Sequence, residues 1–291
     1  LSRDVRKNLR GLAVKVLVTG ANGMLARAIL NQIPGEWEGW AAGKEELDIT
    51  DPRKVQEAIL KFNPALIINC AAFTRVDECE AKRDLAFAVN GTAVGALAEA
   101  AGKAGADFVH FSTDYIFDGT KNRPYDEEDP PHPINVYGAS KWEGERLLRK
   151  HLRKHLLIRA QWLYGQGGNH FVKSILRLAE KQETLRVVDD QVGAPTWTED
   201  LAEATVALIQ KGASGTYHLA DAGQCSWHAF ARRIIEEAGL PTQVVPCKSA
   251  EFPRPARRPA YSVLSTAKAA KELGRQMPAW ETALKRFIRS M

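Results

Sequence analysis

Apolar and polar residues alternate along the first half of the chain with two different periods. Short runs rich in Val, Ile and Leu are typical of strands in a buried parallel sheet, and they occupy residues 14–20, 38–42, 65–72, 107–117 and 155–162. Apolar residues at intervals of three and four predict helices between these runs, over residues 23–33, 51–64, 84–105 and 136–151. This alternation predicts an α/β fold, a Rossmann-type doubly wound parallel sheet with right-handed crossovers.

The ends of the predicted strands carry the chemically informative residues. Ligands of a doubly wound sheet bind beyond the carboxyl ends of its strands. The first such loop, Thr-Gly-Ala-Asn-Gly-Met-Leu-Ala at residues 19–26, has the spacing Gly20-x-x-Gly23-x-x-Ala26. Small residues let the backbone approach a pyrophosphate, and the free N–H groups of the next helix attract it. A tight turn uses the same glycines, but the strand before and the helix after them favour a dinucleotide.

The region after the second strand bears on which dinucleotide binds. An NAD site usually places an acid there to bind the ribose 2′-OH. Here the sequence is Trp-Ala-Ala-Gly-Lys-Glu-Glu-Leu-Asp, and its Lys44 suits a 2′-phosphate, although a solvated loop lysine has the same pattern. The sequence therefore favours NADPH and leaves NADH open.

A tyrosine and a lysine four residues apart, Tyr137 and Lys141, share one face of a predicted helix. A phenol has an ordinary pKa of about 10, and a neighbouring ammonium group is expected to lower it. Many exposed helices carry this pair by chance. The glycine loop and the strand-end hydroxyls of Ser112 and Thr113 instead favour a proton-transferring site.

Composition limits the classes of protein that fit. The chain has 291 residues, 45% hydrophobic and 26% charged, with a formal net charge of +5 and basic residues spread along its length. This predicts a globular protein that binds no nucleic acid. We expect no membrane span, because no unbroken apolar run approaches the roughly 20 residues required. The basic N-terminus lacks the apolar stretch of a secretory signal, and four scattered cysteines predict free thiols, so we expect a cytoplasmic location.

Several longer stretches identify a resemblance. Ser-Thr-Asp-Tyr-Ile-Phe-Asp-Gly (112–119), Asp-Asp-Gln-Val-Gly-Ala-Pro-Thr (189–196) and Arg-Pro-Ala-Tyr-Ser-Val-Leu (258–264) follow each other in that order. With the glycine loop and the Tyr-x-x-x-Lys motif, the chain resembles the dTDP-4-dehydrorhamnose reductase family of the extended short-chain dehydrogenase/reductases. The resemblance implies a nucleotide-sugar substrate and reduction of its C4 ketone with NADPH or NADH. It places along the cofactor Gly20, Gly23, Met24, Leu25, Asp48, Ile49, Ala71, Ala72, Thr74, Tyr137 and Lys141.

The resemblance also implies the chemical roles. Tyr137 would donate a proton to the C4 oxygen, Lys141 would bind the ribose and lower the tyrosine pKa, and Thr113 would bind the same oxygen. Asp114 and Trp162 would contact the sugar. Related dehydratases carry an acid pair directly after the threonine, whereas here Asp114 is followed by Tyr115. Simple carbonyl reduction is therefore expected rather than elimination of water.

Two departures from the family pattern change the expectations. Some members bind magnesium between subunits through a glutamate in the first helix, and Ala28 takes that position, so we expect no obligatory metal. The Arg-Ala-Gln-Trp stretch (159–162) lacks a hydroxyl that the family more often has. Of the histidines, His110 is expected to be a satisfied core residue, while His151 and His155 form a possible metal pair that has no evident third ligand. Arg257 and Arg258 could meet diphosphate oxygens, or form a solvated basic loop.

The chain is expected to have two parts. Residues 1–164 would be mainly a dinucleotide-binding Rossmann domain after a basic extension of residues 1–13. Residues 165–291, richer in loops and proline, would be mainly a substrate-binding lobe with segments that return to the Rossmann core. The chain would be a monomer or a homodimer. Reduction of another nucleotide-4-keto sugar, or a non-catalytic role like that of the regulatory subunit of methionine adenosyltransferase, remains open.

Overall fold

A central parallel sheet organises the molecule. The computed structural model describes residues 14–291, so the predicted basic extension of residues 1–13 lies outside the described residues. The six strands lie in the order β2 (Glu38–Ala42), β1 (Lys15–Thr19), β3 (Leu66–Asn69), β4 (Asp107–Thr113), β5 (Leu156–Ala160) and β10 (Gly215–His218). The five strands predicted from sequence are all present, and the predicted Rossmann-type doubly wound fold is confirmed.

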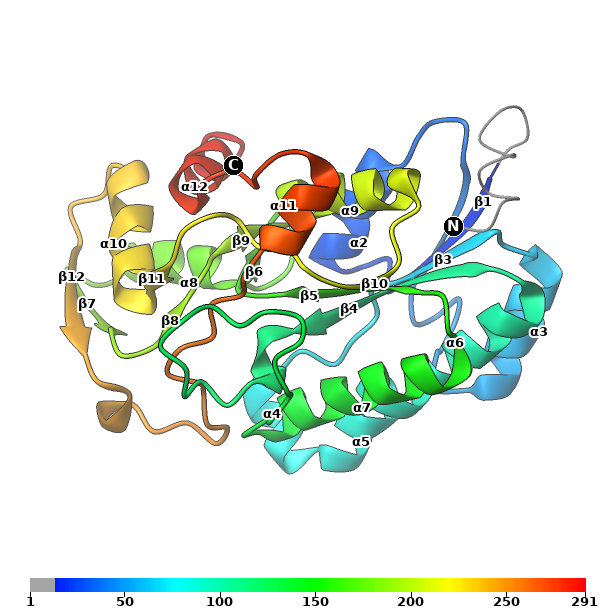
Figure 1. Cartoon of the computed structure of the whole chain (residues 1–291). Helices are drawn as coiled ribbons and strands as arrows, with labels where there is room; N and C mark the ends of the chain where they lie inside the picture. The colour runs from blue at the N-terminus through cyan, green and yellow to red at the C-terminus, as the bar shows by residue number, and fades with distance from the viewer. Residues whose placement is uncertain (1–13) are drawn as a thin grey trace.

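Helices cover both faces of the sheet (Figure 1). On one face lie α2 (Met24–Gln32), α9 (Thr198–Lys211) and α11 (Ala267–Leu273), and on the other lie α3 (Pro52–Phe62), α6 (Ala93–Ala104) and α7 (Val136–His151). Asp51 caps α3, because its carboxylate accepts the N–H groups of Arg53 and Lys54. Each face is thus sealed by its own apolar core, which leaves the strand ends open.

One helical run differs from its predicted form. The predicted helix over residues 84–105 is present as α5 (Arg83–Phe87), a π-helical turn η1 (Ala88–Thr92) and α6, and it follows the short α4 (Val76–Ala81). Gly105 ends it with φ of 68°. The run Arg83–Ala104 has the length and mean hydropathy of a membrane span, but 56% of its most apolar 18-residue stretch is buried inside the structure, so the expected absence of a membrane span stays a prediction. Core helices have the same composition, because alanine packs closely.

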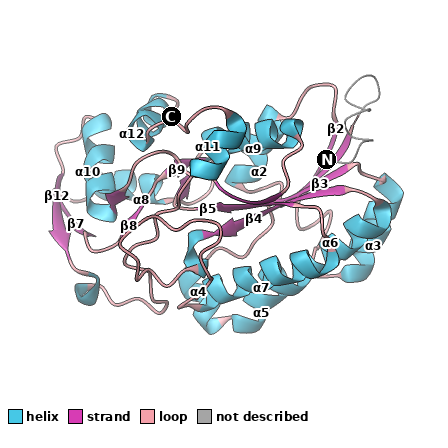
Figure 2. Ribbon diagram, in the orientation of Figure 1, coloured by secondary structure: helices cyan, strands magenta, loops and turns pink. Residues whose placement is uncertain are grey.

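A second group of elements lies at the far end of the sheet, on the left of Figure 2. Its members are α8 (Phe171–Ala179), α10 (Trp227–Glu237), α12 (Trp280–Arg289), η3 (Ser249–Glu251) and the strand pairs β6 (Leu163–Tyr164) with β9 (Thr196–Trp197), β7 (Thr184–Val188) with β12 (Gln243–Cys247), and β8 (Val192–Gly193) with β11 (Cys225–Ser226). They enclose a separate aromatic core. Three elements that follow residue 164 in the chain, α9, β10 and α11, belong to the central sheet and its helices. The division of the chain into two parts at residue 164 stays a prediction.

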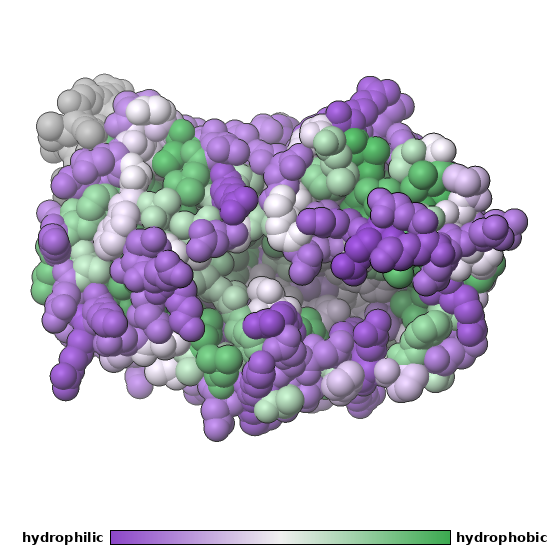
Figure 3. Space-filling view, turned by 180° about the vertical axis from the view of Figure 1, so that it is seen from behind, coloured by the Kyte–Doolittle hydropathy of each residue, from purple (hydrophilic) through white to green (hydrophobic). Residues whose placement is uncertain are grey.

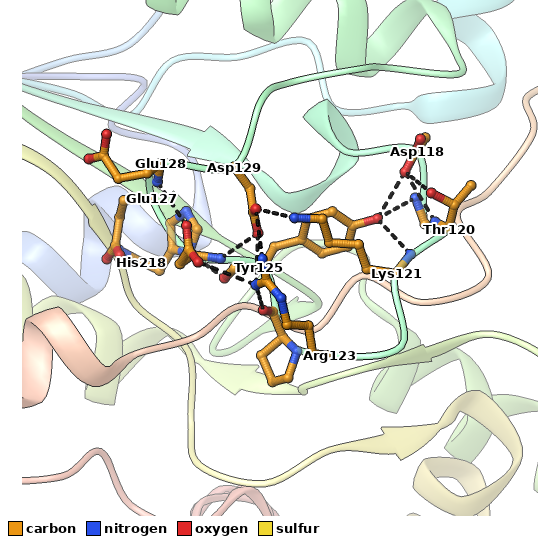
Figure 4. Close-up of polar contacts among 12 residues, drawn as sticks. Asp118, Thr120, Lys121, Arg123, Tyr125, Glu127, Glu128, Asp129 and His218 are labelled. Carbon is orange, nitrogen blue, oxygen red and sulfur yellow. Dashed lines mark hydrogen bonds and ion pairs between the residues drawn. The ribbon is translucent and has the colours of Figure 1, made fainter.

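The loop between β4 and α7 is held by a polar network (Figure 4). After the 3₁₀ turn η2 (Asp114–Ile116), the phenol of Tyr125 donates to Asp118 at 2.9 Å, and buried Asp129 accepts from Arg123 at 3.1 Å. The ring Nδ1 of His218, in β10, contacts the Tyr125 carbonyl at 3.1 Å. These bonds fix the loop that joins the end of β4 to the start of α7, where the candidate site begins.

Candidate active site

An open cleft of about 570 Å³ lies at the carboxyl ends of β1 and β3, where the winding of the sheet reverses direction. Seen from behind, the surface is hollowed between the two halves of the molecule, with hydrophilic side chains along the rims (Figure 3). All the residues assigned to the cofactor line the cleft, namely Gly20, Gly23, Met24, Leu25, Asp48, Ile49, Ala71, Ala72, Thr74, Tyr137 and Lys141, and Lys44 joins them. Tertiary structure thus brings together four separate stretches of sequence.

The glycine loop at one end of the cleft leaves no room for a side chain at Gly20. This residue has φ of 70°, and a Cβ built on it would lie 2.7 Å from the Ala71 nitrogen. Gly23 precedes α2, and no side chain caps the first turn of that helix. The free N–H groups and the positive end of the helix dipole therefore lie beside a narrow backbone cradle, which fits a pyrophosphate.

The opposite end of the cleft is formed by the first turns of α7. Asn135 caps this helix, because its Oδ1 accepts the Gly138 N–H at 2.7 Å. A Cβ on Gly138 would lie only 2.0 Å from the Tyr115 carbonyl oxygen, so the helix packs directly on the turn after β4. This contact sets Tyr137 and Lys141, one turn apart on α7, against the end of β4.

Tyr137 is half-buried beside two buried polar residues, Thr113 and Asp114. The Thr113 hydroxyl donates to Asp114 Oδ1 at 3.0 Å and accepts the Tyr115 N–H at 3.1 Å. Burial, followed by the nearby Asp114 carboxyl, raises the pKa of the Tyr137 phenol well above its usual value, against the opposing effect of the Thr113 hydroxyl. The expectation that Lys141 depresses the tyrosine pKa is therefore wrong for this arrangement, which keeps the phenol protonated.

Lys141 is almost fully buried beneath the cleft. Its Nζ donates to the Phe111 carbonyl at 2.6 Å and lies 3.5 Å from Nε2 of His110. Burial lowers the pKa of Lys141 to about 8, while Glu145 and Cys70 act in the opposite direction. The lysine can therefore change its charge near neutral pH, unlike a lysine in solvent.

The two residues assigned to the sugar lie beyond the cleft. Burial raises the pKa of Asp114 to about 7, against the opposing effect of its hydrogen bonds, the strongest of them from Ser262. Trp162 has φ of 48° and stacks on Trp227, with ring centroids 3.5 Å apart and planes 6° apart. Neither residue lines the 570 Å³ cleft. A left-handed conformation in a bulky residue stores strain, which is typical of functional sites.

Some residues of the site carried no signal in the sequence. Asn90 lies in the π-helical turn, fully buried, and its amide bonds both the N–H of Phe73, at 2.8 Å, and the hydroxyl of Ser140, at 3.0 Å. It thereby ties the loop after β3 to α7. A π-turn inserted in a helix often marks such sites, but its sequence does not differ from that of an ordinary helix. Further lining residues that the sequence did not single out are Asn22, Gly43, Thr50, Cys70, Phe73, Arg75, Leu85, Val89 and Leu163.

The other candidates from the sequence are placed as follows. Ala28 is buried on α2 against the apolar core. Among residues 14–291 no group of three or more His, Cys, Asp or Glu could hold a metal ion, and the His155 ring bonds the Leu152 carbonyl at 2.7 Å. Arg258 forms a two-pronged ion pair with Asp77, at 2.6 and 2.9 Å, so its guanidinium is engaged within the protein.

Comparisons with known proteins agree with this arrangement. The family model of the RmlD substrate binding domain matches residues 14–291. The chain is 37% identical to the dTDP-4-dehydrorhamnose reductase of Burkholderia thailandensis, over 96% of this chain and 99% of that protein, and 42% identical to the spore coat polysaccharide biosynthesis protein SpsK of Bacillus subtilis, over 94% and 96%.

Solved structures give the same assignment. The crystal structure of dTDP-4-dehydrorhamnose reductase from Bacillus anthracis in complex with NADP superposes with a TM-score of 0.93 at 39% identity, covering 96% of this chain and all of that one. A UDP-glucose 4-epimerase from Thermus thermophilus, at 22% identity and a TM-score of 0.83, shares the fold. Sequence identity along nearly the whole chain, together with the glycine cradle and the tyrosine–lysine helix, shows that the chain belongs to the dTDP-4-dehydrorhamnose reductase family.

Proposed function

We propose that the protein reduces the C4 ketone of a dTDP-4-keto-6-deoxy sugar with NADPH or NADH, converting dTDP-4-dehydro-L-rhamnose to dTDP-L-rhamnose. One observation carries the proposal: a single cleft joins the glycine cradle after β1 to the Tyr137–Lys141 pair of α7, and every residue assigned to the cofactor lines it. A dinucleotide placed along this cleft would have its pyrophosphate at Gly20 and Gly23 and its reactive end near Tyr137. The bound cofactor would supply a hydride to C4.

The residues of this chain provide the proton and the orientation. Tyr137 is held protonated by burial, as a proton donor must be at the start of a reduction. The Thr113 hydroxyl, held by the Tyr115 N–H at 3.1 Å, would bind the same ketone oxygen. Asp114 and Trp162 would contact the sugar. Only one acid follows Thr113, which supports carbonyl reduction over elimination of water.

Cofactor preference follows from the end of β2. No acid immediately follows this strand, where Gly43 is succeeded by Lys44, which lines the cleft. Glu46 reaches back to accept the Gly43 N–H at 2.9 Å. Lys44 favours the 2′-phosphate of NADPH, and the relative from Bacillus anthracis was solved with NADP. NADH stays a usable alternative. We expect no obligatory metal, because Ala28 takes the position at which some relatives have a glutamate.

Two other functions are separable by experiment. In the first, the protein carries out the same reaction on a different sugar or nucleotide, which is consistent with its similarity to SpsK, a polysaccharide biosynthesis protein. A non-catalytic dinucleotide-binding subunit would keep the cleft and lose the chemistry. The presence of Tyr137 and Lys141 in the lining of the cleft, with Thr113 directly after the lining residue Ser112, favours catalysis. The monomeric or homodimeric state and a cytoplasmic location stay predictions.

The direct test is oxidation of NADPH and of NADH on addition of dTDP-4-dehydro-L-rhamnose, followed in parallel with cofactor binding. We expect turnover with both cofactors and a higher kcat/KM for NADPH. Cofactor binding without turnover of this sugar would contradict the proposed reaction. Turnover of a different nucleotide-4-keto sugar alone would instead leave the chemistry and change the substrate.

A further inference from the structure

His110 lies in the middle of β4, completely buried, where the sequence indicated an ordinary core residue. Its partner in the register of the sheet is Asn69 of β3. Lys141 of α7 lies on its other side, with Nζ 3.5 Å from the ring Nε2. The imidazole therefore connects a polar side chain within the sheet to the candidate catalytic lysine.

The amide of Asn69 has only one possible orientation. Its Oδ1 accepts the backbone N–H of Ala71 at 3.2 Å and the hydroxyl of Thr19 at 2.6 Å. A backbone N–H can only donate, so this end of the amide must be the oxygen. The Asn69 NH₂ group then faces His110 Nδ1 at 3.1 Å as a donor, and Nδ1 must accept.

The position of the ring proton follows from this bond. Burial, and then the charge of Lys141, hold the pKa of His110 well below its usual value, so the ring is neutral and carries one proton. With Nδ1 acting as an acceptor, that proton is on Nε2 and points toward Lys141 Nζ. A neutral lysine amine can accept this N–H, whereas an ammonium group presents only donors to it.

We propose that His110 is a positioning residue for the reaction: it presents an Nε2–H to Lys141 and thereby lowers the pH at which the lysine loses its charge. The inference rests on the proposed function, in which Lys141 acts beside Tyr137. The chain of contacts runs from the backbone at Ala71, through Asn69 and His110, to the lysine. It would make the charge of Lys141 depend on an amide in the sheet rather than on solvent.

Other charged and polar groups act on the same two side chains. Glu145, one turn further along α7, and Cys70, at the end of β3, favour the charged lysine. His155 disfavours a charge on His110, and the Asn69 backbone carbonyl favours one. The Phe111 carbonyl accepts from Lys141 in either charge state. Since none of these groups is removed by a substitution at His110, their effect stays constant in the test.

The kinetic test compares the pH profiles of kcat for wild type and His110→Leu, which removes both ring nitrogens at similar size. We expect the alkaline limb, where the lysine loses its charge, to move to higher pH by roughly half to one pH unit, the effect of one hydrogen-bond dipole. A limb that stays in place or moves to lower pH would overturn the proposal. A merely structural role would lower the folded fraction without moving the limb.

The matched control is His218→Leu. His218 is also buried and also contacts a cation, Arg159, at 3.2 Å. It lies away from the cleft, so this variant should lose stability while its alkaline limb stays where it is. If both variants moved the limb equally, the effect would be a general consequence of a cavity, and the proposal would be wrong.

A second measurement requires neither catalysis nor a folded variant. The ¹⁵N NMR spectrum of the histidine rings in the wild-type protein reports directly which nitrogen carries the proton. We expect His110 to carry its proton on Nε2 between about pH 6 and pH 9, and His218 to carry it on Nδ1. A proton on Nδ1 of His110 would contradict the proposal, even if the sugar reduction is confirmed. The expected tautomer would support it even if the substrate proves to be another.

Discussion

Helix α7 bears two buried polar groups, on successive turns, that use similar residues differently. Toward the cleft, Lys141 lies beside His110 and has a pKa of about 8. One turn further, Glu145 forms a double ion pair with Arg159, at 3.0 and 2.9 Å, and Arg159 contacts His218. Both groups pair a histidine with a cation, at nearly the same burial.

The difference lies in which partner can titrate. Arginine keeps its proton at any physiological pH, so Arg159 donates to His218 Nε2, and the remaining ring N–H faces the Tyr125 carbonyl. Burial, together with Arg159, lowers the pKa of His218 to about 3, so this ring stays neutral. Lysine can lose its proton, and in the proposed arrangement His110 donates instead of accepting. A rigid ion pair thus supports the helix at one turn, while a titratable amine is available at the previous turn.

Replacing Tyr137 by phenylalanine should break the chemistry alone. The phenol has no role in the Glu145–Arg159 group, so we expect kcat to fall by about 10²- to 10⁴-fold, the usual contribution of a positioned proton donor. Cofactor affinity and the unfolding temperature should change little. Steady-state kinetics with a fluorescence titration of NADPH checks this, and an unchanged kcat would contradict the assignment of Tyr137 as proton donor.

Replacing Arg159 by methionine should lower the stability of the protein rather than break its chemistry. Removing one partner of a buried ion pair leaves the Glu145 carboxylate paired only with the more exposed Arg149, at 2.9 Å, which should reduce the free energy of unfolding by about 3 kcal/mol, the low end of the usual range. Urea denaturation measures the loss. The double variant Arg159→Met/Glu145→Leu should recover part of it. Stability equal to wild type in the single variant would show that the pair contributes nothing.

Asn135 caps the start of α7, the helix that bears both polar groups. Asn135 bonds the Gly138 N–H and, through its NH₂ group, the Arg257 carbonyl at 2.7 Å. Asn135→Ala should lower stability by about 1 kcal/mol, and it should also lower kcat, because Tyr137 lies in the turn that the cap holds. Asp51→Ala, which removes the cap of α3, is the matched control with a similar stability loss. A drop in kcat in both variants would mean that general stability, not the cap of α7, governs activity.

The pH dependence of kcat and stability should be the smallest effect. It should distinguish the two polar groups of α7 in the wild-type protein, without any mutation. The charge of Lys141 is lost as the pH rises through about 8, so kcat should decline by up to about tenfold per pH unit above that value. The unfolded chain binds this proton more tightly than the folded one, so stability should rise with pH between about 8 and 10.5 from this residue. The Glu145–Arg159 pair should not titrate there. Rate profiles and denaturation over this range provide the check.

Much of the site could be predicted because it depends on local sequence. A glycine spacing, a strand-end Ser-Thr and a tyrosine four residues before a lysine each occur within one element, and the order of the elements assigns them to one edge of the sheet. The contacts of Asn90, His110 and Arg258 could not be predicted from their neighbours in sequence. Their partners are 17, 31 and 181 residues away, at Phe73, Lys141 and Asp77.

The sequence by itself determined the alternation of strands and helices and the glycine loop after the first strand, because hydrophobic period and backbone sterics act over a few residues. Only the tertiary structure decided the charge states. Burial raises the pKa of Tyr137, where the sequence suggested that Lys141 would lower it, and burial also brings the pKa of Lys141 into the range of neutral pH. The cost of burying a charge depends on everything packed around it, and that environment forms only when distant segments meet.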